Sequence, residues 1–154
     1  MIRSCPRCSS PVEPKALDRV SGEDKPLALR IEGMPVAKCA KGHAMPVHRD
    51  FMLWLIQELK ARSAALPAGS EKGLLMKKYR CACGAELGAE SGRRAFPFEL
   101  AFEGAPAFRA EIEMPVFKCP ACGKEQLRSD KDAPRHVAGA IVAINDAVGF
   151  PHSG

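Results

Sequence analysis

The chain has 154 residues, a formal charge of +5 and an aromatic content of 6%. Its longest apolar run, FMLWLI at 51–56, is too short to cross a bilayer, and the N-terminal MIRSCPRC has no apolar signal segment. We therefore expect a cytoplasmic protein with no membrane association. In a reducing cytoplasm, clustered cysteines are metal ligands more often than disulfides.

An internal repeat divides the chain into two similar parts. The stretch IEGMPVAKC at 31–39 returns as IEMPVFKC at 112–119, so each copy leads to a cysteine. We predict an α+β protein of two tandem zinc-ribbon-like units, each a small antiparallel sheet with metal knuckles followed by a helix. The units span 1–66 and 74–154, with a linker at 67–73. Units this small commonly need a metal or disulfides for stability.

The first unit begins with CPRC and continues with a predicted hairpin. Leu27, Leu29 and Ile31 alternate as on a strand with one covered face, and SGED at 21–24 is a turn-forming cluster. Apolar residues at helical spacing then predict a helix over about 48–66, which ends before the Pro and Gly of the PAGSEKG linker.

The second unit repeats this order with a stronger strand signal. Phenylalanines alternate with other residues before the turn-forming EGAP at 103–106, and apolar residues alternate again before Cys119. A helix is predicted over about 132–149, with Asp132 as N-cap and Pro134 in the first turn. Pro35 and Pro115 suit a strand end or a sheet edge, because proline cannot donate to a ladder.

The cysteines fall into two groups with metal-ligand spacing. Each group supplies four sulfur or imidazole donors in two close pairs, which is what a closed tetrahedral Zn²⁺ site requires. A tight turn aims two donors at one ion, and the pairs meet only when the intervening hairpin has folded, so metal binding and folding are coupled. The predicted ligands are Cys5, Cys8, Cys39 and His43 in site one, and Cys81, Cys83, Cys119 and Cys122 in site two.

Some of these ligand and metal assignments have alternatives. His48 is a rival to His43 as the fourth ligand of site one, whereas His136 and His152 have no cysteine nearby and are expected to be solvated. Iron is an alternative to zinc at site two, since four thiolates bind either metal. A catalytic zinc keeps one open position, and both predicted sites have four protein ligands.

The ligand motifs carry a family resemblance. IEGMPVAKCAKGH, preceded by CPRC and followed by a helix, resembles the YgiT-type zinc finger, the N-terminal module of MqsA-like antitoxins. YRCACGAEL with FKCPACGKEQ looks like the same ribbon, and is also similar to the small zinc-containing subunit of acetone carboxylase. The resemblance implies zinc ribbons. Family antitoxins carry a helix-turn-helix domain after the ribbon, whereas single helices follow here.

The first predicted helix has more apolar surface than one small ribbon covers. Phe51, Leu53 and Trp54 lie outside its main apolar stripe. We expect this surplus to pack against the second unit or a second copy, with a separate protein partner as the alternative, because large apolar patches are seldom left exposed.

These features favour a non-catalytic zinc protein that acts as an interaction or assembly module, such as a small accessory subunit. The alternative is nucleic-acid binding, for which Arg3, Arg7, Lys38 and Lys41 lie near site one. Seven metal-bound thiolates and two dications would reduce the formal charge to about +2, and stacking aromatics are scarce. No small-molecule substrate is predicted, although CPRC and CPAC resemble dithiol motifs and leave a redox switch that releases zinc open.

Overall fold

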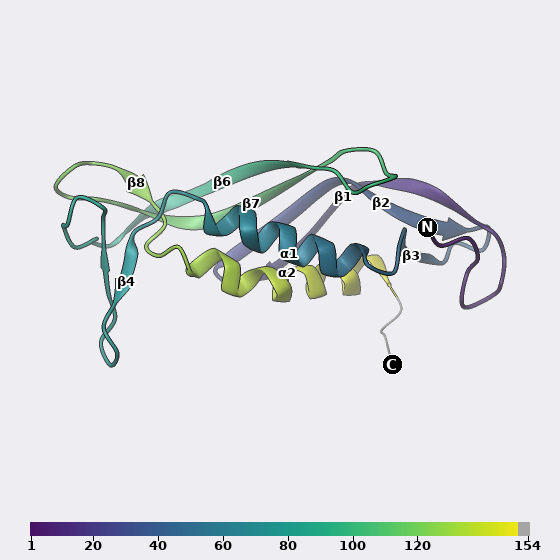
Figure 1. The fold of residues 1–154 in the computed structure, drawn as a ribbon, viewed down its shortest axis with the longest axis horizontal. Coiled ribbons are helices and arrows are strands. Elements are labelled where there is room, and N and C mark those ends of the chain that lie inside the picture. The colour runs from purple at the N-terminus through teal and green to yellow at the C-terminus, as the bar shows by residue number, and fades with distance from the viewer. Residues whose placement is uncertain (151–154) are drawn as a thin grey trace.

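The computed structural model describes residues 1–150 and is of the α+β class. One predominantly antiparallel sheet forms a layer, and two helices lie side by side against one of its faces (Figure 1). A small separate hairpin projects beside them. The elements are β1 (Val12–Asp24), β2 (Leu27–Cys39), β3 (Ala44–Pro46), α1 (Phe51–Ala64), β4 (Ser70–Lys72), β5 (Lys78–Arg80), β6 (Glu90–Leu100), β7 (Phe108–Lys118), β8 (Glu125–Gln126) and α2 (Asp132–Val148).

The two halves of the chain join in this single sheet. Its long strands follow the order β1-β2-β7-β6, while β3 pairs with β2 and β8 pairs with β7. The central pair, β2 and β7, is antiparallel, with Leu29 opposite Ile112 and Ile31 opposite Ala110. Between these two pairs, Arg30 faces Glu111 and forms an ion pair with it. The two repeated strands therefore lie against each other and run in opposite directions.

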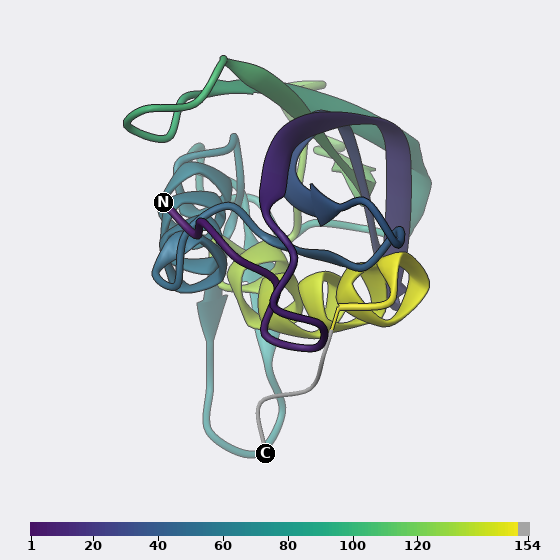
Figure 2. The same ribbon diagram turned by 90° about the vertical axis from the view of Figure 1, so that its right-hand side faces the viewer.

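Both halves also contribute to one hydrophobic core. Alternate residues of β2 and β7 point to the helix side because successive side chains on a strand face opposite ways. The two helices place apolar residues against these strands, at spacings of three and four along the chain. Buried members of this core are Leu27, Leu29, Ile31, Ala110, Ile112, Met114, Phe51, Leu55, Leu59, Val137, Ile141 and Ile144. Figure 2 shows the helix layer covering one face of the sheet end-on.

The helices meet the rest of the core in different ways. Helix α2 approaches β1 closely at two glycines, since a Cβ on Gly22 would lie 2.5 Å from the Ala140 carbonyl oxygen and one on Gly139 would lie 2.6 Å from Asp24. Helix α1 instead contacts an aromatic cluster. Within this cluster Phe51 and Phe102 meet edge to face at 5.3 Å, and Trp54 and Phe102 at 5.2 Å.

Several strands and helices begin or end at residues other than those predicted. The SGED stretch at 21–24 is not the first turn but the end of β1, and the chain turns at Lys25 and Pro26 instead. Gly22 is needed inside the strand because α2 leaves no room there for a side chain. The helices predicted over 48–66 and 132–149 span Phe51–Ala64 and Asp132–Val148. Lys131, rather than Asp132, is the N-cap residue of α2.

The stretch predicted as a linker, 67–73, contains ordered structure. Its strand β4 pairs with β5 in an antiparallel hairpin, and Ala68 forms a parallel bridge with Leu127. Gly69 is tightly enclosed, because a Cβ there would lie 2.7 Å from the Arg80 carbonyl oxygen. This segment is therefore packed onto the second half of the chain.

The three apolar residues proposed for partner binding lie in different environments. Phe51 is fully buried in the shared core, and Trp54 is half-buried against Phe102 and Phe108. Leu53 is 60% exposed. Packing within the chain thus accounts for Phe51 and most of Trp54, and leaves Leu53 on the surface. No helix within residues 1–150 is long and apolar enough to cross a membrane.

The close approach of α2 to β1 can be tested with Gly22→Ala. Alanine normally suits a strand better than glycine, but here its Cβ would meet the α2 backbone. We expect the free energy of unfolding to fall by about 1–3 kcal/mol. Gly88→Ala is the matched control, because a Cβ at residue 88 would have no atom within 4 Å. Chemical denaturation measures both; an unchanged midpoint for Gly22→Ala would contradict the packing described.

Candidate metal centres

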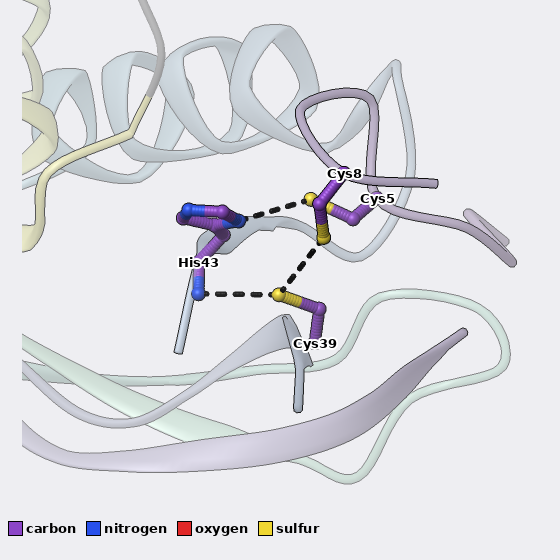
Figure 3. A group of neighbouring side chains, drawn as sticks. All are labelled: Cys5, Cys8, Cys39 and His43. Carbon is purple, nitrogen blue, oxygen red and sulfur yellow. Dashed lines mark hydrogen bonds between the residues drawn. The ribbon is translucent and has the colours of Figure 1, made fainter. Parts of the chain in front are cut away.

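Site one joins the N-terminal loop to the end of the first hairpin. Cys5 and Cys8 lie in the loop before β1, Cys39 is the last residue of β2, and His43 immediately precedes β3. Figure 3 shows the three sulfur atoms and the His43 ring gathered around a common space. The Cys5 Sγ lies 3.5 Å from the His43 Nδ1, and the Cys8 Sγ lies 3.8 Å from the Cys39 Sγ.

Site two has the same plan at the opposite end of the sheet. Cys81 and Cys83 follow β5, while Cys119 and Cys122 lie between β7 and β8. The Cys81 and Cys122 sulfur atoms are 3.6 Å apart, as are those of Cys83 and Cys119. Because β2 and β7 are antiparallel and each ends at a ligand pair, the two sites occupy opposite ends of the sheet.

The distances within each group fit a shared ion. All four ligand atoms of each site lie within 4.8 Å of one another. A regular tetrahedron with zinc–sulfur bonds of 2.3 Å places its sulfur atoms about 3.8 Å apart. A disulfide would bring two sulfurs to about 2.05 Å, and all seven cysteines are free. Two groups of Cys and His residues are thus arranged to hold a metal ion each.

The ligand turns are built by backbone hydrogen bonds to the first cysteine of each pair. The N–H of Gly123 donates to the carbonyl oxygen of Cys119. In the same way, the N–H of Ser9 donates to the carbonyl oxygen of Cys5. Gly123 has φ 77° and Ser9 has φ 60°, in the left-handed region that favours glycine. Ser9 therefore adopts a strained backbone conformation to close the Cys5–Cys8 turn.

Hydrogen bonds to sulfur favour the thiolate form of several ligands. The side chain and backbone of Ser10 lower the pKa of Cys8 to about 6. The backbone N–H of Cys83 and the Gln126 side chain lower the pKa of Cys81 to about 6. Such groups give up their protons near neutral pH, as metal ligation requires.

The thiols of site two oppose each other when no cation is present. The Ala85 backbone hydrogen bond lowers the pKa of Cys83, but the neighbouring Cys119 and Cys81 outweigh it and raise that pKa to about 11. Ionised sulfurs this close repel one another, so one of them retains its proton. A dication reduces this conflict because it attracts all four thiolates and offsets two of their four negative charges.

The structure brings together all eight predicted ligands and separates the other histidines from them. His43, not His48, completes site one. The His48 Nδ1 instead accepts a hydrogen bond from the Asp50 N–H at 3.1 Å. His136, expected to be solvated, is partly buried, and its Nδ1 lies 3.1 Å from Asp24. His152 lies outside the described residues.

Sequence reasoning missed Gln126, which is buried beside site two. Its Nε2 donates to the Cys81 Sγ at 3.2 Å. Gln126 of β8 pairs with Phe117, which lies two residues before Cys119. The equivalent residue beside site one is Met45, which pairs with Ala37, two residues before Cys39. Nothing in the sequence marks this role, since it follows from strand register and not from ligand spacing.

No family model, curated protein or solved structure matches this chain. The resemblance to YgiT-type zinc fingers and to the acetone carboxylase subunit therefore stays a prediction from the ligand motifs. The interpretation of the two groups as metal centres rests on the geometry of this chain's own residues.

The role of Gln126 can be tested with Gln126→Met, which places the site-one residue type beside site two. Loss of the N–H···S hydrogen bond should lower the zinc affinity of site two about 10-fold, as for other groups that support a metal ligand. Competition with a chromogenic chelator measures the affinity. Met45→Leu is the control and should leave both sites unchanged, because Met45 donates no hydrogen bond to sulfur. An unaltered affinity in Gln126→Met would reject the proposed support.

Proposed function

We propose that the protein is a non-catalytic structural zinc protein built from two tandem zinc-ribbon-like units. The observation that carries this proposal is the closure of two four-donor groups, each drawn from segments more than thirty residues apart. Three thiolates with an imidazole, and four thiolates, are typical ligand sets of structural zinc. Zinc is favoured over iron because three thiolates with one imidazole, the donor set of site one, are typical of structural zinc, and site two follows the same plan.

The same geometry argues against catalysis at the metals. Four protein donors fill a tetrahedral shell, whereas a catalytic zinc holds water or substrate in one open position. One ligand of each close pair is buried, namely Cys5, Cys39, Cys81 and Cys119, whereas Cys83 and Cys122 of site two are exposed. The sites therefore suit stabilisation of the sheet ends.

An assembly role is supported by apolar side chains on the helix layer. Leu53 of α1 is 60% exposed and Val142 of α2 is 55% exposed, although both helices have well-filled buried faces. A rigid sheet with a metal centre at each end would hold these helices in a fixed arrangement for a protein partner. We infer a small accessory subunit or adaptor whose helix layer contacts that partner.

Metal dependence is tested by elemental analysis with native mass spectrometry of the full chain. We expect two zinc ions per chain, one in His43→Ala, and two in the control His48→Ala, because His48 lies outside the ligand group. Removal of zinc by a strong chelator should abolish the cooperative thermal transition, since binding and folding are coupled. A metal-free protein that melts cooperatively at the same temperature would refute the structural zinc role.

The helix-layer role is tested with Leu53→Glu. A charge at this exposed position should leave the fold intact, yet weaken any complex that buries the α1 surface, because an unpaired buried charge is costly. Size-exclusion chromatography and co-purification from the source lysate measure association. Lys60→Glu is the control, since Lys60 is also exposed on α1. If Leu53→Glu keeps every partner that the unaltered chain has, the interface lies elsewhere.

Nucleic-acid binding is the alternative function. It is favoured by Arg3, Arg7 and Lys41, which are exposed around site one, and by Lys38 beside them. Within residues 1–150 none of these four side chains forms an ion pair. Phosphate contacts by such cations make affinity fall steeply with salt, which distinguishes this function from an apolar protein interface.

A further inference from the structure

The β4–β5 hairpin ends in three consecutive exposed apolar residues. Leu74, Leu75 and Met76 are 98%, 100% and 80% exposed, and together they form the tip of the hairpin that projects beyond the helices (Figure 1). Single exposed apolar residues are ordinary on protein surfaces. Three in succession at a projecting turn expose an apolar surface that nothing else in the described chain covers.

The hairpin is held firmly against the body of the protein. The Glu71 side chain is only 7% exposed, and its carboxylate accepts hydrogen bonds from the Ser129 Oγ and the Arg135 Nη2, each at 3.2 Å. Tyr79 belongs to the facing strand, β5. The Arg128 guanidinium lies over its ring, 4.5 Å from the ring centroid. These contacts fix the base of the hairpin, so the tip projects at a defined place.

Lysines lie on both strands of the hairpin, directly behind this tip. Lys72 and Lys78 are exposed and stand opposite each other in the β4–β5 register. Like charges in this position destabilise a strand pair, and neither lysine forms an ion pair within residues 1–150. An anionic surface placed against the hairpin would relieve their repulsion. Lys77 lies beside them and pairs with Glu71.

We propose that the hairpin is an anchor for an anionic lipid surface, with Leu74, Leu75 and Met76 entering the boundary between headgroups and acyl chains. Lys72 and Lys78 then contact the anionic headgroups. The order along the hairpin axis, apolar tip followed by cations, matches the order of acyl chain and headgroup in a lipid leaflet. This role replaces the expectation of no membrane association, goes beyond the proposed assembly function and does not depend on a protein partner.

The lipid surface explains the tip better than a protein groove does. An apolar groove could accept the three apolar side chains, but it would leave Lys72 and Lys78, directly behind the tip, without an anionic partner. A lipid leaflet requires only that apolar and cationic groups lie at the right depths. One short turn with a few cations gives reversible binding that depends on lipid charge and on salt.

The first experiment measures co-sedimentation of the zinc-loaded full chain with vesicles. We expect binding when about a third of the lipid is phosphatidylglycerol and little binding to phosphatidylcholine alone. Leu74→Ser/Leu75→Ser should abolish the binding. The matched control Leu53→Ser removes an exposed leucine elsewhere and should bind like the unaltered chain.

A second pair of variants tests the cations. Lys72→Gln/Lys78→Gln should reduce partitioning into the anionic vesicles about 30-fold, because each lysine near such a surface contributes about 1 kcal/mol of electrostatic attraction. Lys41→Gln/Lys60→Gln has the same change of net charge at exposed positions away from the hairpin. This control should retain binding within a factor of about 2. An equal loss in both pairs would show attraction by net charge alone and overturn the proposal.

Insertion itself is measured by tryptophan fluorescence. Leu75→Trp in a Trp54→Phe background places the sole tryptophan at the tip, and its emission should shift to shorter wavelength on addition of the anionic vesicles. A folded, zinc-loaded chain that binds no anionic vesicles would overturn the proposal. A dimer that Leu74→Ser/Leu75→Ser disrupts, without vesicle binding, would assign the tip to a second copy and likewise overturn it.

Discussion

The antiparallel pairing of β2 with β7 is the interaction on which the arrangement of this molecule depends. It joins the two halves into one sheet and gives their helices a common face to cover. Because the paired strands run in opposite directions, their terminal cysteines point to opposite ends of the sheet. The helices that follow also run in opposite directions, side by side (Figure 1). A two-stranded ribbon is at best marginally stable alone, and here each ribbon is completed by the other.

The core and the ligand groups restrain different parts of the long strands. The core covers the middle of β2 and β7, where Leu29, Ile31 and Ile112 are fully buried. The ligand groups lie beyond it, where Cys39 and Cys119 draw the chain towards distant segments. Pro35 and Pro115 were expected at a strand end or sheet edge, but they lie inside β2 and β7, past the β2–β7 ladder, which spans 28–32 and 109–113. Their missing N–H groups therefore interrupt no hydrogen bond of the central pair.

Features encoded by local spacing were predictable from the sequence, whereas features set by contact between the halves were not. The alternation at Leu27, Leu29 and Ile31 is confirmed as a strand, and the predicted ligands come together as two groups. The turn assigned to SGED was wrong because Gly22 serves a helix contact more than a hundred residues away, not a reversal of the chain. The role of Gln126 likewise depends on register, which leaves no trace in spacing.

The ion pair at the centre of the sheet has a further consequence. Arg30 and Glu111 occupy equivalent places in the two repeats, one residue before Ile31 and Ile112, and the register sets them opposite each other. In a symmetric homodimer with the same strand arrangement, this point would lie on the two-fold axis, and any residue there would face its own copy. A cation opposite an anion is available here only because the two halves differ at this position. The pair thus matches one half to the other and disfavours exchange of either half for a second copy of itself.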